Sequence, residues 1–195
     1  VLDILLKISP NGIDNFILPI LQTWAAADSN KELGGLEIMK GQANRGVLEP
    51  LYDYQSALIY DFIGDRENAY ISYKNIIKRS NNANAHVYSR AAIFFANNNY
   101  SELYDETITK LETIDPYSNE LLILKKTKAK SVKNNINNIK DGIAEVFLNS
   151  AEILFNEGLD RQALIYAQIA SYLAPNSDSA YYLLGRIFKS IDNNE

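Results

Sequence analysis

Apolar and polar positions along the chain recur with the spacing of amphipathic helices, and these helices come in pairs. Small residues lie at helical intervals on one face of several segments, and turn residues or prolines follow them. This pattern predicts an all-α chain of antiparallel helix pairs. The predicted helices cover residues 51–64, 66–80, 85–98, 101–116, 143–158 and 160–175.

The helix pairs repeat at a nearly constant interval. Ala57 and Ala92 occupy equivalent places 35 positions apart, and Ala151 and Gly185 do so 34 positions apart. An interval of about 34 residues with two helices per unit is the length of one class of helical repeat. Each unit alone leaves an apolar face open, so neighbouring units must stack.

The residue types within each pair fit close helix packing. Two helices approach closely only where side chains are small, so we expect Ala57 to meet Ala69 and Ala151 to meet Ala163. Larger side chains should fill the space between layers, namely Tyr60, Tyr73, Ile76, Leu154, Tyr166 and Leu173.

The turns within the pairs carry helix-ending and helix-starting residues. Gly64 and Gly158 follow the first helices, where a left-handed residue ends a helix at the least steric cost. Asp65 and Asp160 come next and are expected to cap the second helices.

The stretch EGLDRQALIYAQIASYLAPNSDSAYYLLG resembles the tetratricopeptide repeat family. It carries glycine, three small residues and proline where that family keeps them, at Gly158, Ala163, Ala167, Ala170 and Pro175. The segments AAADSN, LYDYQSALIYD and DGIAEVFLNSAEIL look like long bacterial repeat proteins, mainly alphaproteobacterial, whose roles are mostly unassigned. The resemblance implies a right-handed α-α superhelix, a solenoid of about five units.

We therefore expect one solenoid over residues 1–195, as a fragment of a longer array. Its expected parts are the end of a preceding unit (1–12), a degenerate repeat (15–48), repeats at 50–83 and 85–118, an irregular helix and loop (119–143), a repeat at 144–177, and the first helix of an incomplete unit (178–195).

Three features depart from the repeat. Gly34 and Gly41 replace alanines in the degenerate unit. Tyr104 stands where a small residue is usual, so that helix pair is expected to splay. A helix is expected near 118–130, followed by a loop over 131–141 that delays the next unit.

Enzymatic chemistry has little support. The chain has one histidine, His86, and no cysteine, so histidine pairs and thiolates are unavailable as metal ligands. No phosphate-binding glycine loop is present. We expect a non-enzyme without cofactor or metal, with His86 at the surface near a helix start. The enzymatic rival requires an unrecognised site or a further domain.

The concave surface of such a solenoid is lined by the first helix of each pair. The register of the family places the following candidate contacts there: Tyr54, Leu58, Asp61, Phe62, His86, Ser89, Glu145, Leu148, Glu152, Phe155, Tyr182 and Arg186. Rings supply contact area for an extended peptide or a helix. The carboxylates of Asp61, Glu145 and Glu152 favour a ligand with basic residues. The alternative is that several rings only pack against neighbouring helices.

The expected function is a non-catalytic scaffold that binds a protein or peptide in this groove. One rival is a structural spacer or assembly module that contacts partners through its edges. A second is an accessory domain of an enzyme or of an envelope or polysaccharide-related assembly. None of these three functions predicts a particular oligomeric state.

Net charge and hydropathy argue against two classes of partner, nucleic acid and a spanned membrane. The net charge of −5 argues against a nucleic-acid partner, and no apolar run reaches the roughly 18 residues of a membrane span. We expect the lysine-rich segment 125–140 to be a solvated loop, and the alternatives are contact with an acidic partner, a membrane surface or nucleic acid. The bacterial resemblance leaves the cytoplasm open, or the periplasm if a leader precedes this sequence.

Overall fold

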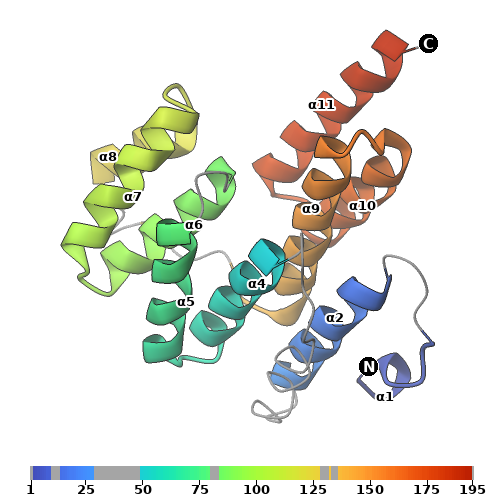
Figure 1. Cartoon of the computed structure of the whole chain (residues 1–195), viewed down its shortest axis with the longest axis horizontal. Helices are drawn as coiled ribbons and strands as arrows, with labels where there is room; N and C mark the ends of the chain where they lie inside the picture. Colours follow the sequence, from blue (N-terminus) through green and yellow to red (C-terminus); the bar gives the residue numbers. More distant parts are fainter. Residues whose placement is uncertain are drawn as a thin grey trace. The chain divides into compact units, whose positions relative to one another are not determined.

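The computed structural model describes residues 2–9, 14–28, 49–79, 84–127, 132 and 136–194, and these parts are helices joined by turns (Figure 1). They contain no strand, so the predicted all-α class is confirmed for the described chain. The contacts divide the chain into two compact units. The first unit comprises Val1–Gln55 and Asn138–Glu195, and the second comprises Ser56–Asn137. The boundary falls within α4 (Glu49–Phe62).

Three consecutive helices pack on one another in the first unit: α9 (Ile139–Asn156), α10 (Asp160–Leu173) and α11 (Asp178–Asn194) (Figure 1). As predicted, Ala151 and Ala163 are both fully buried and lie in the same core. Small side chains let the helix backbones approach, and aliphatic side chains fill the remaining space. The rest of this core is Leu148, Leu154, Ala167, Ala170, Ala180, Leu183 and Ile187.

Trp24 anchors α2 (Asp14–Asp28) against α9. Its side chain is fully buried, and its indole Nε1 donates a hydrogen bond to Gln55 Oε1 at 2.9 Å. A Cβ atom at Gly142 would overlap the six-membered ring of Trp24, so only glycine lets α9 come this close. The short helix α1 (Leu2–Leu5) packs against α2, and Gln22 Nε2 donates to the Leu5 carbonyl at 3.1 Å.

The start of α9 lies four residues before the predicted position at Ile143. Asn138 explains the difference, because its side chain accepts a hydrogen bond from the Asp141 backbone N–H and so caps the helix at Ile139. The predicted cap at Asp160 is wrong. Asp160 is the first residue of α10, Leu159 occupies the cap position without a side-chain bond, and the Asp160 carboxylate accepts from Ser190 Oγ at 2.6 Å.

The second unit contains the rest of α4, α5 (Arg66–Arg79), α6 (Ala85–Asn97), α7 (Ser101–Ile114) and α8 (Asn119–Thr127). Helices α6 and α7 pack closely, and α8 lies against both. Ala57 and Ala69 are fully buried. Aromatic rings form much of this core, with Tyr73 and Phe94 centroids 4.8 Å apart and Tyr70 and Tyr100 centroids 4.6 Å apart.

The turns follow the sequence prediction at two positions. Gly64 and Gly158 have φ angles of 82° and 74°, the left-handed conformation that glycine adopts without strain. Asp65 caps α5 as predicted, since its Oδ1 accepts from the Asn68 backbone N–H at 3.1 Å. In the turn before α7, Asn99 takes the same left-handed conformation with φ 63°.

Two predicted features fall partly outside the described residues. Gly34 and Gly41 of the degenerate repeat lie in 29–48, outside that part of the chain. The lysine-rich segment is not one loop where it is described. Lys125 and Lys126 belong to the last turn of α8, and Lys140 belongs to the first turn of α9, with its Nζ 6.0 Å from the centroid of the Tyr172 ring.

Candidate functional site

The twelve predicted contact residues divide sharply by exposure. Five are buried, namely Tyr54, Leu58, Ser89, Glu145 and Leu148. Five are partly exposed, namely Asp61, Phe62, His86, Glu152 and Phe155. Two are exposed, namely Tyr182 and Arg186. His86 is the second residue of α6, close to the helix start as predicted.

Burial has a clear cause at three of these positions. The Tyr54 hydroxyl donates a hydrogen bond to Glu145 Oε2 at 3.2 Å, so the two side chains bond to each other inside the first unit. Leu148 belongs to the core between α9, α10 and α11. Glu145 therefore does not present its carboxylate at the surface. Of the three carboxylates expected to favour a basic ligand, Asp61 and Glu152 are left.

Three predicted residues come together at the surface of the first unit. The guanidinium carbon of Arg186 lies 5.0 Å from the centroid of the Phe155 ring and 5.9 Å from that of the Tyr182 ring. We call these residues the Arg186 cluster. Tyr182 and Arg186 share one face of α11 because they are four positions apart, and Phe155 comes from the last turn of α9.

The Arg186 cluster combines a held cation with accessible rings. Each cation–π contact at an exposed site stabilises the arrangement by about 0.5–1 kcal/mol, which restrains the guanidinium without burying it. Tyr182 remains 69% exposed. Arginine and tyrosine are enriched among the residues that dominate binding energy at protein interfaces, so this cluster has the composition of a contact site.

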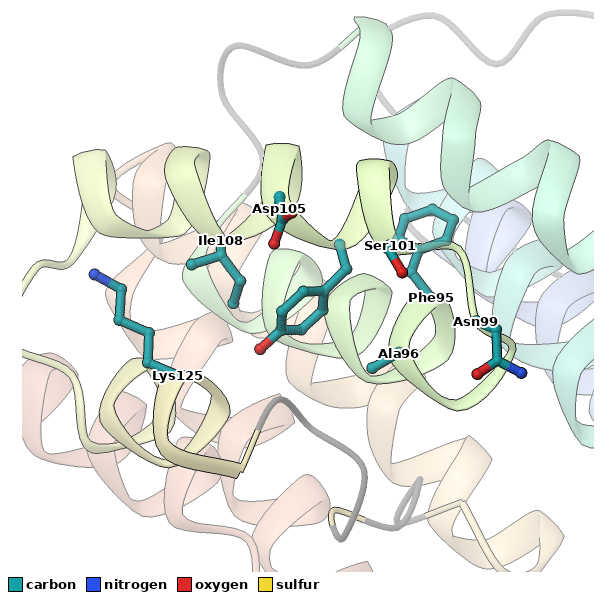
Figure 2. Close-up of a pocket in the computed structure, with 8 residues that line it drawn as sticks. Phe95, Ala96, Asn99, Ser101, Asp105, Ile108 and Lys125 are labelled. Carbon is teal, nitrogen blue, oxygen red and sulfur yellow. The ribbon is translucent and has the colours of Figure 1, made fainter.

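A second feature was not predicted: a cavity of about 400 Å³ in the second unit. Figure 2 shows the residues that line it, which come from α6, α7, α8 and the α6–α7 turn. They are Phe95, Ala96, Asn99, Ser101, Tyr104, Asp105, Ile108 and Lys125. The Tyr104 hydroxyl donates to the Leu124 carbonyl of α8 at 2.8 Å. The one sequence signal for this cavity was Tyr104 at a position where a small residue is usual.

The described residues hold no group of three or more histidine, cysteine or acidic side chains placed to bind a metal ion. Among the described helices, none is both long enough and apolar enough to cross a membrane.

Comparison of the chain with models of known protein families, with curated proteins and with solved structures found no match.

Proposed function

We propose that this protein is a non-catalytic binding scaffold of the tetratricopeptide type, a right-handed superhelix that engages a protein or peptide through its first helices. Support for the repeat comes from the recurring pair of small residues: Ala57 with Ala69, and Ala151 with Ala163, are all fully buried. The observation that carries the proposed function is the Arg186 cluster, because it brings together three of the expected contact residues and includes the two that are exposed.

The chemistry of the cluster favours a partner with an apolar side chain beside a carboxylate. The Phe155 and Tyr182 rings offer apolar area, and the Arg186 guanidinium presents N–H donors in a planar fork that matches a carboxylate. Glu152, one turn before Phe155 on α9, is the predicted carboxylate nearest in sequence to this cluster. A basic residue near the acidic one in the peptide would suit Glu152, which keeps part of the expected preference for basic ligands.

The test is a selection from a random phage-displayed peptide library on the wild-type protein, followed by fluorescence polarisation with the enriched peptides. We expect Arg186→Ala and Tyr182→Ala each to weaken binding about tenfold or more, as truncation of a dominant interface residue does. Arg161→Ala is the matched control, because Arg161 is exposed on α10 outside the cluster.

Circular dichroism of each variant establishes that it is folded before the affinities are compared. Enriched peptides that bind the Arg186 and Arg161 variants equally well would remove the cluster from the binding surface. A selection that enriches no peptide at all would contradict peptide binding by this unit.

A second candidate, an assembly module, is favoured by one comparison within the repeat. On α9, Phe147 stacks on Tyr166 of α10 with ring centroids 5.6 Å apart, and Ala151 is fully buried. Thirty-four positions later on α11 stand Tyr181 and Gly185, and both are exposed. Phe188, the equivalent of Leu154, is 47% exposed. This face of α11 would accept a helix with the alanine spacing of α10.

A stapled helical peptide with the sequence of residues 160–173 tests the second candidate. We expect it to bind the protein, and we expect Phe188→Glu to abolish the binding because a carboxylate would be placed in an apolar contact. Arg186→Ala should leave this binding nearly unchanged. Failure of the peptide to bind the wild-type protein would argue against an edge contact of this kind.

A further inference from the structure

Two departures from the repeat meet at one place in the second unit. In two repeats, a second alanine follows the buried alanine of the first helix by twelve positions. Ala69 follows Ala57 in this way, and Ala163 follows Ala151. After Ala92 the equivalent residue is Tyr104. The other departure is α8, a helix that belongs to no repeat pair. The Tyr104 hydroxyl donates to the Leu124 carbonyl of α8, so the two irregular features are bonded to each other.

The cavity lies at this junction. A phenol ring cannot occupy the space of an alanine methyl group between two close helices, and here Tyr104 lines a hollow of about 400 Å³ instead (Figure 2). That volume is in the range of about 300–1,000 Å³ found for small-molecule sites. Phe95 and Ile108 are buried and form apolar lining.

The polar lining contains a single carboxylate, that of Asp105. The Asp105 carboxylate makes no ion pair among the described residues, and it lines the cavity from α7, one helical turn after Ser101, whereas Asn99 lies apart at one end of the lining (Figure 2). Lys125 is the one lysine or arginine of the lining, and its Nζ already pairs with Glu112 Oε1 at 2.6 Å. The cavity therefore offers a negative charge and neutral polar groups around an apolar base.

We propose that this cavity is a binding site for a small organic cation, a protonated amine carried on a compact apolar body. The ammonium group would face the Asp105 carboxylate, which is the one carboxylate of the lining. The apolar body would rest on Phe95, Tyr104 and Ile108. This site is independent of the Arg186 cluster, which belongs to the other unit.

The electrostatics of Tyr104 agree with this assignment. Burial raises the pKa of the Tyr104 phenol, and the negative charge of Asp105 raises it further. The negative charge of Asp105 therefore acts at the Tyr104 side chain in the cavity lining, where it disfavours a second negative charge and favours a positive one.

Matched probes and isosteric variants test the proposal. Phenethylamine carries the ammonium group on an apolar body, and 2-phenylethanol has the same body without the charge. Chemical-shift perturbation in the isotope-labelled full chain locates each probe and gives its affinity at millimolar concentrations. We expect saturable shifts at the lining residues with phenethylamine and weaker binding of the alcohol.

Asp105→Asn should weaken phenethylamine binding about three- to fivefold, the size of an exposed charge pair, and should leave the alcohol unchanged. Glu106→Gln is the control, because Glu106 is the neighbouring carboxylate and pairs with Lys110 at 3.3 Å rather than lining the cavity. Ala96→Trp would fill the cavity and should prevent binding of both probes.

Three results would overturn the proposal. One is the absence of saturable shifts at the lining residues with phenethylamine. Another is equal affinity for the amine and the alcohol. The third is an equal loss of amine binding in the Asp105 and Glu106 variants.

Discussion

The Tyr54 hydroxyl and the Glu145 carboxylate form a buried hydrogen bond of 3.2 Å, although the two residues are 91 positions apart. Tyr54→Phe removes only the donor. The carboxylate would then stay buried with one hydrogen bond fewer, so we expect the free energy of unfolding to fall by about 1–3 kcal/mol. Urea denaturation followed by circular dichroism measures this change.

Tyr181→Phe provides the control for Tyr54→Phe, because the Tyr181 side chain is 53% exposed. Surface substitutions of this kind change stability by at most about 0.5 kcal/mol. Equal losses in the two variants would mean that the buried hydrogen bond contributes nothing specific.

Gly142→Ala should destabilise the first unit. The added methyl group would overlap the Trp24 ring, and either α9 or the indole would have to move. We expect a loss of about 1–3 kcal/mol, typical of overpacking in a core, measured as a lower urea midpoint.

Gly185→Ala is the matched comparison for Gly142→Ala. Gly185 lies within α11, and a Cβ there would meet no atom within 4 Å. Alanine is the better helix former, so this variant should gain about 0.5–1 kcal/mol. Changes of the same sign in both variants would contradict the packing described at Trp24.

Ser89→Ala should stabilise the protein. Ser89 is 4% exposed, and its hydroxyl has no hydrogen-bond partner among the described residues. Removing an unsatisfied buried hydroxyl avoids a desolvation cost of about 1–3 kcal/mol, and we expect part of that as a gain in thermal and urea stability.

Ser150→Ala completes the comparison with Ser89→Ala. Ser150 is equally buried, but its hydroxyl donates to the Val146 carbonyl at 2.7 Å. Ser150→Ala removes this hydrogen bond, so its free energy of unfolding should be lower than that of Ser89→Ala. The reverse order of stability would show that the Ser89 hydroxyl is satisfied in solution.

Because of Tyr104, we expect the free energy of unfolding to depend on pH in the alkaline range. Burial, and then the charge of Asp105, raise its pKa above the ordinary value of 10.0. A proton is therefore held more tightly in the folded protein than in the unfolded chain. The resulting stability is complete below pH 10.0 and is lost as pH rises through the higher folded-state pKa.

Carbon NMR of labelled tyrosine rings measures the titration of Tyr104 directly, with Tyr104→Phe to assign its signal. We expect the pKa to lie above 10.0 and to fall in Asp105→Asn. A Tyr104 signal that titrates at or below the ordinary value would contradict the burial of the phenol.

The sequence predicted the helix boundaries correctly where residues close in sequence determine them. The turns at Gly64 and Gly158 have the expected left-handed backbone, and α5 begins at Arg66 and α6 at Ala85 as predicted. Periodicity also identified Ala151 and Ala163 as the small residues that share a core. These features depend on residues close in sequence, so a repeating pattern contains the information.

The contact surface was predicted less well, because exposure depends on contacts distant in sequence. The register places Tyr54 and Glu145 on the same kind of helix face as Tyr182. Only the fold shows that the first two bond to each other while Tyr182 stays exposed. The cavity beside Tyr104 likewise depends on α8, whose position no repeat pattern specifies.

Trp24 gives the molecule a built-in optical probe of one unit. It is the single tryptophan of the chain, and it is fully buried in the first unit with its indole bonded to Gln55. Tryptophan emission therefore follows the loss of structure around α2 and α9, whereas far-ultraviolet circular dichroism follows every helix. If the two units melt separately, the two signals will report different midpoints from the same sample.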